Sequence, residues 1–139
     1  MKRKVVSILT LCALLLSALC TSASAALPEQ VSPLWENTFA VDAQIAFEDG
    51  IGYIGIAISG KTGVTNIYAD ITLSYKNDDG RWIIMEEWGH NSPGMTFGFD
   101  DTFEATAGVE YKLYVSAIVT KGNVDELIEK TATVVCPSN

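Results

Sequence analysis

The sequence predicts an all-β protein that folds as an antiparallel β-sandwich of about seven strands. Three observations support this prediction. Apolar and polar residues alternate with a period of two along most of the chain after residue 38, as in strands with one buried face. Turn sequences rich in glycine and aspartate recur about every eight to twelve residues. No segment of useful length shows the spacing of an amphipathic helix.

Residues 1–25 are expected to form a secretory signal peptide. Three basic residues at positions 2–4 precede an apolar run over residues 5–19, and small residues at positions 23–25 supply a cleavage site. The apolar run is shorter than the ~20 residues that span a bilayer. The mature chain is therefore expected to begin at Ala26 and to act outside the cell, either free or at the cell surface.

A lipoprotein signal at Cys20 is the alternative for this leader. Lipidation requires a small residue directly before the cysteine, and Leu19 is large. Ordinary cleavage is therefore preferred. It divides the chain into a signal peptide over residues 1–25, an N-terminal segment over residues 26–38 and one β-sandwich domain over residues 39–139.

The charge of the mature chain excludes two classes of partner. The leader holds three of the nine basic residues and none of the 17 acidic ones, which leaves six against 17 and a net charge of −11. So acidic a domain is unsuited to nucleic acid and to anionic membrane surfaces. No apolar run in the mature chain is long enough to span a membrane.

The first three strands are expected over residues 39–48, 54–59 and 66–75. Asp49-Gly50 and residues 60–63 supply the turns between them. In each strand one parity is apolar and is expected to face the core. These inward residues are Phe39, Val41, Ala43, Ile45, Phe47, Ile54, Ile56, Ile58, Ile67, Ala69, Ile71, Leu73 and Tyr75.

The remaining four strands are expected over residues 81–88, 95–99, 109–119 and 128–134. Residues 77–80 form a strong hairpin turn before the first of them, and residues 90–94 are expected to form a loop after it. In that first strand Glu86 shares the parity of the tryptophans, which a bulge or an edge position would explain. The other inward residues are Met95, Phe97, Phe99, Val109, Tyr111, Leu113, Val115, Ala117, Val119, Ile128, Ala132 and Val134.

Tyr111 refines the fold class. It follows the Gly108 turn and opens the penultimate strand, an arrangement similar to the tyrosine corner of immunoglobulin-like domains. The fold expected is therefore an immunoglobulin- or fibronectin-III-like sandwich. The cysteine pair of antibody domains is missing, although Trp82 is a candidate core tryptophan.

Several segments carry a resemblance to known proteins. They are residues 31–38 (VSPLWENT), 59–63 (SGKTG), 77–82 (NDDGRW), 108–113 (GVEYKL) and 134–136 (VVC), together with Trp88. In these the chain resembles small secreted β-sandwich proteins of Gram-positive, often gut-dwelling, bacteria. The resemblance implies fold and bacterial origin and carries no activity. Relatives often hold a second cysteine on the second strand, where this chain has Ile54, so it implies that Cys136 has lost its partner.

Cys136 is the one cysteine of the mature chain and has two interpretations. A leftover cysteine in a secreted protein is a candidate for a disulfide between two chains. The preferred interpretation is a small apolar residue on the last strand.

The residues for catalysis or metal binding are sparse. His90 lies near Ser92, with Asp100 and Asp101 downstream, but no strained serine elbow is present. Glu86 and Glu87 are adjacent on a strand and should point to opposite faces, so they cannot form the carboxylate pair of a glycosidase. We expect no enzyme, no cofactor and no metal, with a hydrolase as the remote alternative.

Calcium is the other alternative that the acidic loops leave open. Candidate oxygen ligands lie at residues 48–49, 78–79, 100–101 and 104, although none of these groups has the spacing of an EF-hand. One histidine and one distant cysteine do not make a zinc site.

The aromatic residues are the better indication of function. Tyr68 and Tyr114 have the polar parity of their strands, so both are expected on one outer face of a sheet, with Trp88 as a further candidate. An exposed aromatic patch on a small secreted domain indicates binding. The predicted function is extracellular binding of a protein or glycan by a non-enzymatic domain, with a carbohydrate-binding or calcium-assisted adhesion module as the alternative.

Overall fold

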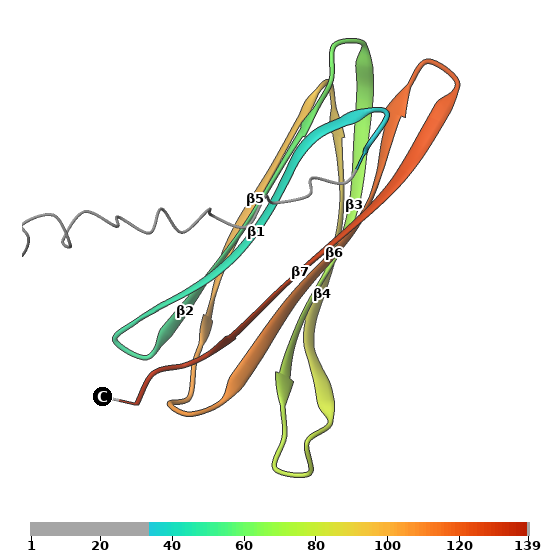
Figure 1. The fold of residues 1–139 in the computed structure, drawn as a ribbon. Helices are drawn as coiled ribbons and strands as arrows, with labels where there is room; N and C mark the ends of the chain where they lie inside the picture. Colours follow the sequence, from blue (N-terminus) through green and yellow to red (C-terminus); the bar gives the residue numbers. More distant parts are fainter. Residues whose placement is uncertain (1–33, 139) are drawn as a thin grey trace, which may run out of the picture. The chain divides into compact units, whose positions relative to one another are not determined.

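The computed structural model describes residues 34–138, which form seven antiparallel strands (Figure 1). The predicted all-β sandwich is confirmed. The strands are β1 (Thr38–Glu48), β2 (Ile51–Gly60), β3 (Val64–Lys76), β4 (Trp82–Pro93), β5 (Thr96–Glu104), β6 (Glu110–Lys121) and β7 (Val124–Val135). The expected signal peptide lies outside the described residues.

Two sheets share the seven strands. One has the order β1-β2-β5 and the other has the order β4-β3-β6-β7. The hairpins β1–β2, β3–β4 and β6–β7 stay within a sheet, whereas the connections after β2, β4 and β5 cross to the opposite sheet (Figure 1). This alternation lets both sheets bury one face against the other.

The core consists of the inward parity of both sheets. Ile56 on β2, Ile71 on β3 and Leu113 and Val115 on β6 are each at most 4% exposed, as their central place on alternating strands predicts. The register places Ile71 opposite Val115 and Leu73 opposite Leu113. Branched aliphatic side chains therefore fill the space between the sheets.

Tyr111 forms the predicted corner. Its side chain is 3% exposed, and the backbone N–H of Thr106 donates to its hydroxyl oxygen at 2.9 Å. Gly108 makes the turn between them with φ of +79°, a region that glycine enters without strain. The tyrosine thus fixes the loop between β5 and β6 against the start of β6.

A bulge explains the irregular pattern of β4. Leu73 on β3 pairs with Glu86 and Ser74 pairs with Ile84, so Met85 is an extra residue on β4. The extra residue reverses the parity of β4 on its two sides. β4 is also an edge strand, as its sequence suggested.

The same bulge overturns the expectation for Trp82. Trp82 lies before the bulge in the chain and pairs with Lys76, whose side chain is on the outer face. Trp82 is therefore on the outer face too and is not a core tryptophan.

Four other expectations were wrong. Met95 was expected inward but lies before the start of β5 and is 46% exposed, and Val134 was expected inward but is 37% exposed near the end of the edge strand β7.

Phe39 was expected inward but is 76% exposed, because a register shift between Thr38 and Ala40 reverses the parity at the start of β1. Residues 90–94 were expected to be a loop, but β4 continues to Pro93 because its pairing with β3 runs to Asn66.

Cys136 is 4% exposed and unpaired. A buried sulfur cannot meet a second chain without local opening, so the structure gives the alternative interpretation, a disulfide between two chains, no support. The preferred interpretation, a small apolar side chain, matches its burial.

Among residues 34–138 no helix is long and apolar enough to cross a membrane.

Hydrogen bonds hold the start of the domain against the β6–β7 hairpin. The Glu126 carboxylate accepts from the N–H of Glu36, from the N–H of Asn37 at 3.1 Å and from the hydroxyl of Thr38 at 2.6 Å. The side-chain amide of Asn37, itself 2% exposed, donates to the carbonyls of Val119 and Val124 at 3.0 and 3.1 Å. We call this group the Glu126 latch.

Candidate functional site: the outer face of the four-stranded sheet

The outward side chains of β4, β3, β6 and β7 around Tyr68 and Tyr114 form the candidate site, here called the tyrosine face. Tyr68 pairs with Asn91 on β4 and Ile118 on β6, and Ile118 pairs with Leu127 on β7. Strand pairing therefore aligns Tyr68, Ile118 and Leu127 in one row across three strands. Their exposed fractions are 38%, 39% and 64%. This row is an apolar stripe open to solvent.

Tyr68 is held in a defined position. Its hydroxyl donates to Asp70 Oδ1 at 2.7 Å, and this bond, followed by the negative charge of Asp70, raises the pKa of Tyr68. A Cβ added to Gly89 would lie 3.0 Å from the Tyr68 hydroxyl. The ring therefore reaches over β4 at the one position where no side chain obstructs it.

Tyr114 shares the face of Tyr68 but does not touch it. Tyr114 pairs with Thr72, four residues from Tyr68 on β3, which is about 13 Å along the strand. It is half-buried, and its hydroxyl donates to Glu129. That hydrogen bond and burial raise the pKa of Tyr114. The two tyrosines thus occupy one outer face as predicted, at separate positions.

A shallow hollow of about 400 Å³ lies beside Tyr68 on the tyrosine face. Its rim carries the carboxylates of Asp70 and Glu87 and the hydroxyl of Thr72. Trp88, the third predicted site residue, contributes to the floor of this hollow, but its side chain faces inward. It pairs with Ile71, and its ring lies 5.2 Å from that of Phe99. Trp88 therefore closes the core and adds no exposed ring.

Trp82 occupies the far end of the tyrosine face, a position that parity alone did not predict. Lys112 Nζ lies 4.3 Å and Lys76 Nζ 5.3 Å from the centroid of its ring. Both distances suit cation–π contacts. Trp82 is on β4 and Lys112 is on β6, with β3 between them. The indole therefore extends over β3 to reach Lys112. Only recognition of the β4 bulge would have revealed this from the sequence.

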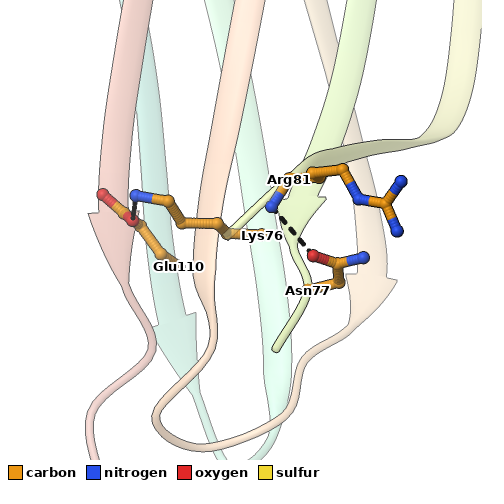
Figure 2. A network of polar contacts seen from close by, with 4 residues as sticks. All are labelled: Lys76, Asn77, Arg81 and Glu110. Atoms are coloured by element: carbon orange, nitrogen blue, oxygen red, sulfur yellow. Dashed lines mark hydrogen bonds and ion pairs between the residues drawn. The ribbon is translucent and has the colours of Figure 1, made fainter. Parts of the chain in front are cut away.

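Polar contacts fix the surroundings of Trp82. Lys76 Nζ forms an ion pair with Glu110 at 2.9 Å, and the backbone N–H of Arg81 donates to Asn77 Oδ1 at 2.8 Å (Figure 2). The second bond closes the β3–β4 turn, which directs the chain back into β4. Lys76 is therefore shared between Glu110 and the indole.

The residues for hydrolysis are not brought together. His90 packs its ring 5.3 Å from that of Phe99, and the Ser92 hydroxyl donates to the carbonyl of Thr96 at 2.9 Å. Glu86 pairs with inward Leu73 and Glu87 with outward Thr72, so the two carboxylates point to opposite faces as predicted. Within residues 34–138 no three potential metal ligands cluster.

Comparison with known proteins gives distant structural similarities. No protein family and no curated protein matches the chain. Among solved structures it is similar to Spo0M, a sporulation control protein from Bacillus subtilis, with a TM-score of 0.44 and 16% identity over 76% of this chain and 51% of that one. The chain thus spans about half the length of that protein.

Two further structures are similar. CsgH from R. palustris has a TM-score of 0.44 and 9% identity, over 64% of this chain and 87% of that one. A protein from Arabidopsis thaliana has a TM-score of 0.41 and 9% identity, over 88% and 96%.

Proposed function

We propose that this protein is a secreted, non-enzymatic binding domain that docks an extracellular partner on its tyrosine face. The observation that carries the proposal is the exposed row of Tyr68, Ile118 and Leu127, which the strand register aligns on the outer face of the four-stranded sheet. Association with a partner that covers this apolar row is favourable, because it removes apolar surface from water.

The anchoring of the tyrosines also supports binding. The Tyr68 hydroxyl is fixed by Asp70 and the Tyr114 hydroxyl by Glu129, so a partner would meet rings that have already lost rotational freedom. Preorganised side chains reduce the entropic cost of association. The leader that the sequence predicts over residues 1–25 supports an extracellular location for this surface.

A carbohydrate ligand is the second candidate, and the hollow beside Tyr68 favours it. Sugar rings stack on aromatic rings, and their hydroxyl groups donate to carboxylates such as those of Asp70 and Glu87. A protein partner would instead cover the full row as far as Leu127. The two candidates therefore differ in which residues they need.

The test is attachment of the labelled protein to the surface of the producing cells and to a glycan array. A Tyr68→Ala/Tyr114→Ala variant should keep its fold and lose attachment. Tyr53→Ala, on the outer face of the other sheet and 43% exposed, is the matched control and should attach normally. Loss of attachment in a Leu127→Ser variant indicates a protein partner. Binding to the glycan array, together with loss of attachment in a Glu87→Gln variant, indicates a sugar. Unchanged attachment of the double variant contradicts the proposal.

A further inference from the structure

The edge of β4 is a second unusual surface, and it borders the tyrosine face. Ile83, Ile84 and Met85 follow one another on this strand and are 37%, 57% and 37% exposed. In the described part of the chain β4 pairs only with β3, so its other edge carries free backbone N–H and C=O groups. Three consecutive exposed apolar residues on a free edge are uncommon in a monomeric domain.

A groove opens directly beside this edge. It has a volume of about 220 Å³ and lies between Met85 on β4 and Glu104 at the end of β5, with Tyr75, Val109 and Tyr111 among its lining residues. Cavities of ~150 Å³ accept a benzene-sized group, so there is room for a phenylalanine or leucine side chain.

Aromatic contacts set one limit of the groove. The ring of Phe99 on β5 lies 5.2 Å from that of Trp88 and 5.3 Å from that of His90, both on β4. These contacts join the two sheet edges in that region. Near Met85 no such aromatic contact bridges the edges within residues 34–138, so the groove stays open there.

The position of the groove matches what an added strand would require. A peptide strand paired with the free edge of β4 would point alternate side chains between the two sheets, where the groove lies, and the others outward beside Ile84. Met85 is the bulge residue and has no partner on β3. Its side chain stands at the mouth of the groove and would flank an inserted apolar group.

Charge defines the chemistry of the occupant. Glu86 and Glu87 follow Met85 on the edge, and Glu104 lines the opposite side of the groove. These carboxylates would repel an acidic segment and attract lysine or arginine. A second copy of this strongly acidic chain is therefore a poor occupant.

We propose that the β4 edge and its groove bind an extended peptide segment of another protein, in which bulky apolar side chains alternate with basic ones. Backbone pairing with β4 supplies affinity, and the groove takes one apolar side chain. The groove shares no lining residue with the hollow beside Tyr68, although Ile84 and Glu87 lie on the outer face of the same sheet.

The experiment is a fluorescence-anisotropy titration of the protein with a labelled heptapeptide that alternates lysine with valine and phenylalanine. Controls are a peptide of the same composition with its lysines in one block, and the alternating peptide with N-methylated backbone amides. We expect binding of the alternating peptide and at least about tenfold weaker binding of both controls.

Protein variants locate the site. Met85→Glu and Ile84→Glu should each weaken binding about tenfold or more, whereas Met95→Glu should leave it unchanged. Met95 is a matched control because it is also exposed, at 46%, and its substitution adds the same charge. The more exposed Ile84 keeps the test valid should Met85→Glu unfold the protein.

Several results would overturn the proposal. The first is absence of binding of the alternating peptide. The others are binding of the block peptide as tight as that of the alternating peptide, or a loss of binding with Met95→Glu as large as that with Met85→Glu. Either of these would mean that general attraction between opposite charges explains the interaction. Loss with Tyr68→Ala/Tyr114→Ala instead of Met85→Glu would assign the peptide to the tyrosine face. Self-association that Met85→Glu abolishes would identify a second copy as the occupant.

Discussion

Single hydroxyl groups have distinct structural roles in this domain. The hydroxyl oxygen of Tyr111 accepts a hydrogen bond from a loop backbone and lies inside the protein, whereas those of Tyr68 and Tyr114 donate to carboxylates on the surface. The first contributes to stability. The others orient the rings of the tyrosine face.

Tyr111→Phe should lower the free energy of unfolding by about 1 kcal/mol, because the part-buried N–H of Thr106 loses its acceptor. Denaturant titration measures the change. Tyr75→Phe is a comparison on the neighbouring strand, where Tyr75 pairs with Tyr111. If Tyr111→Phe is as stable as the wild type, the hydrogen bond of the Tyr111 corner does not contribute to stability.

Gly89→Ala should displace the ring of Tyr68, because the new Cβ would lie 3.0 Å from its hydroxyl and 3.3 Å from Asp70 Oδ1. The hydrogen bond to Asp70 raises the pKa of Tyr68, so the pKa should fall toward its ordinary value in the variant. Titration of the tyrosine ring carbons by NMR measures this. A pKa that does not move would mean that the ring stays in place.

Two of the residues that the alternating pattern misplaced share one physical cause. Phe39 and Trp82 each lie beyond a register irregularity, where one extra residue reverses the parity of the strand. Parity is a local rule and correctly placed Ile71, Leu113, Tyr68 and Tyr114. The contacts of Trp82 with Lys76 and Lys112 depend on three strands at once and could not be read from one of them.

At the scale of elements, the Glu126 latch joins the beginning of the domain to the β6–β7 hairpin. Burial raises the pKa of Glu126, but the Thr38 hydroxyl and the backbone of Glu36, Asn37 and Thr38 hydrogen-bond to the carboxylate and outweigh it. The net result is a pKa below the ordinary value. The ionised carboxylate is therefore the form that the folded state prefers.

The sign of the pH dependence follows. A carboxyl group whose pKa is lowered by folding stabilises the protein above its unfolded pKa, and this contribution is lost as the pH falls through the folded value. Glu126→Gln should therefore be less stable than the wild type at neutral pH, and the difference should shrink in acid. Urea unfolding across this pH range is the measurement. A constant difference would mean that the charge of Glu126 is irrelevant.

The elements themselves were largely predictable, since the turns after residues 48, 59 and 76 and the alternating strands are local features. Tyr68 and Tyr114 were expected on one outer face of a sheet, and the pairing of β3 with β6 confirms this. The extension of β4 to Pro93 was not predicted, because it depends on backbone pairing with β3.

At the scale of the whole molecule, stability depends on the aliphatic layer between the sheets. Leu113 is fully buried at the centre of β6. Leu113→Ala should cost about 2–5 kcal/mol, through lost apolar burial and the cavity that remains. Chemical denaturation measures it, with Leu127→Ala on the surface as the control that should cost far less. Similar losses in both variants would contradict the strand register.

At the scale of the whole molecule, the proposed function depends on a difference between the outer faces of the two sheets. The tyrosine face carries Tyr68, Tyr114, Ile118 and Leu127, whereas the outer face of the β1-β2-β5 sheet carries small residues such as Gly55, Ala57 and Gly98 around Tyr53. Only the first presents an apolar row. The exposed parity of the tyrosines was predicted from the sequence, but the row itself depends on the register of three strands.

Photo-crosslinking on the producing cells tests this difference most directly. A benzophenone side chain replaces Leu127 in one variant and Tyr53 in another, and covalent adducts with surface molecules are compared after illumination. We predict adducts of defined mass from position 127 and none from position 53, with the position-127 adducts lost when Tyr68→Ala is added. Adducts from position 53 alone would contradict the assignment of the tyrosine face as the docking surface.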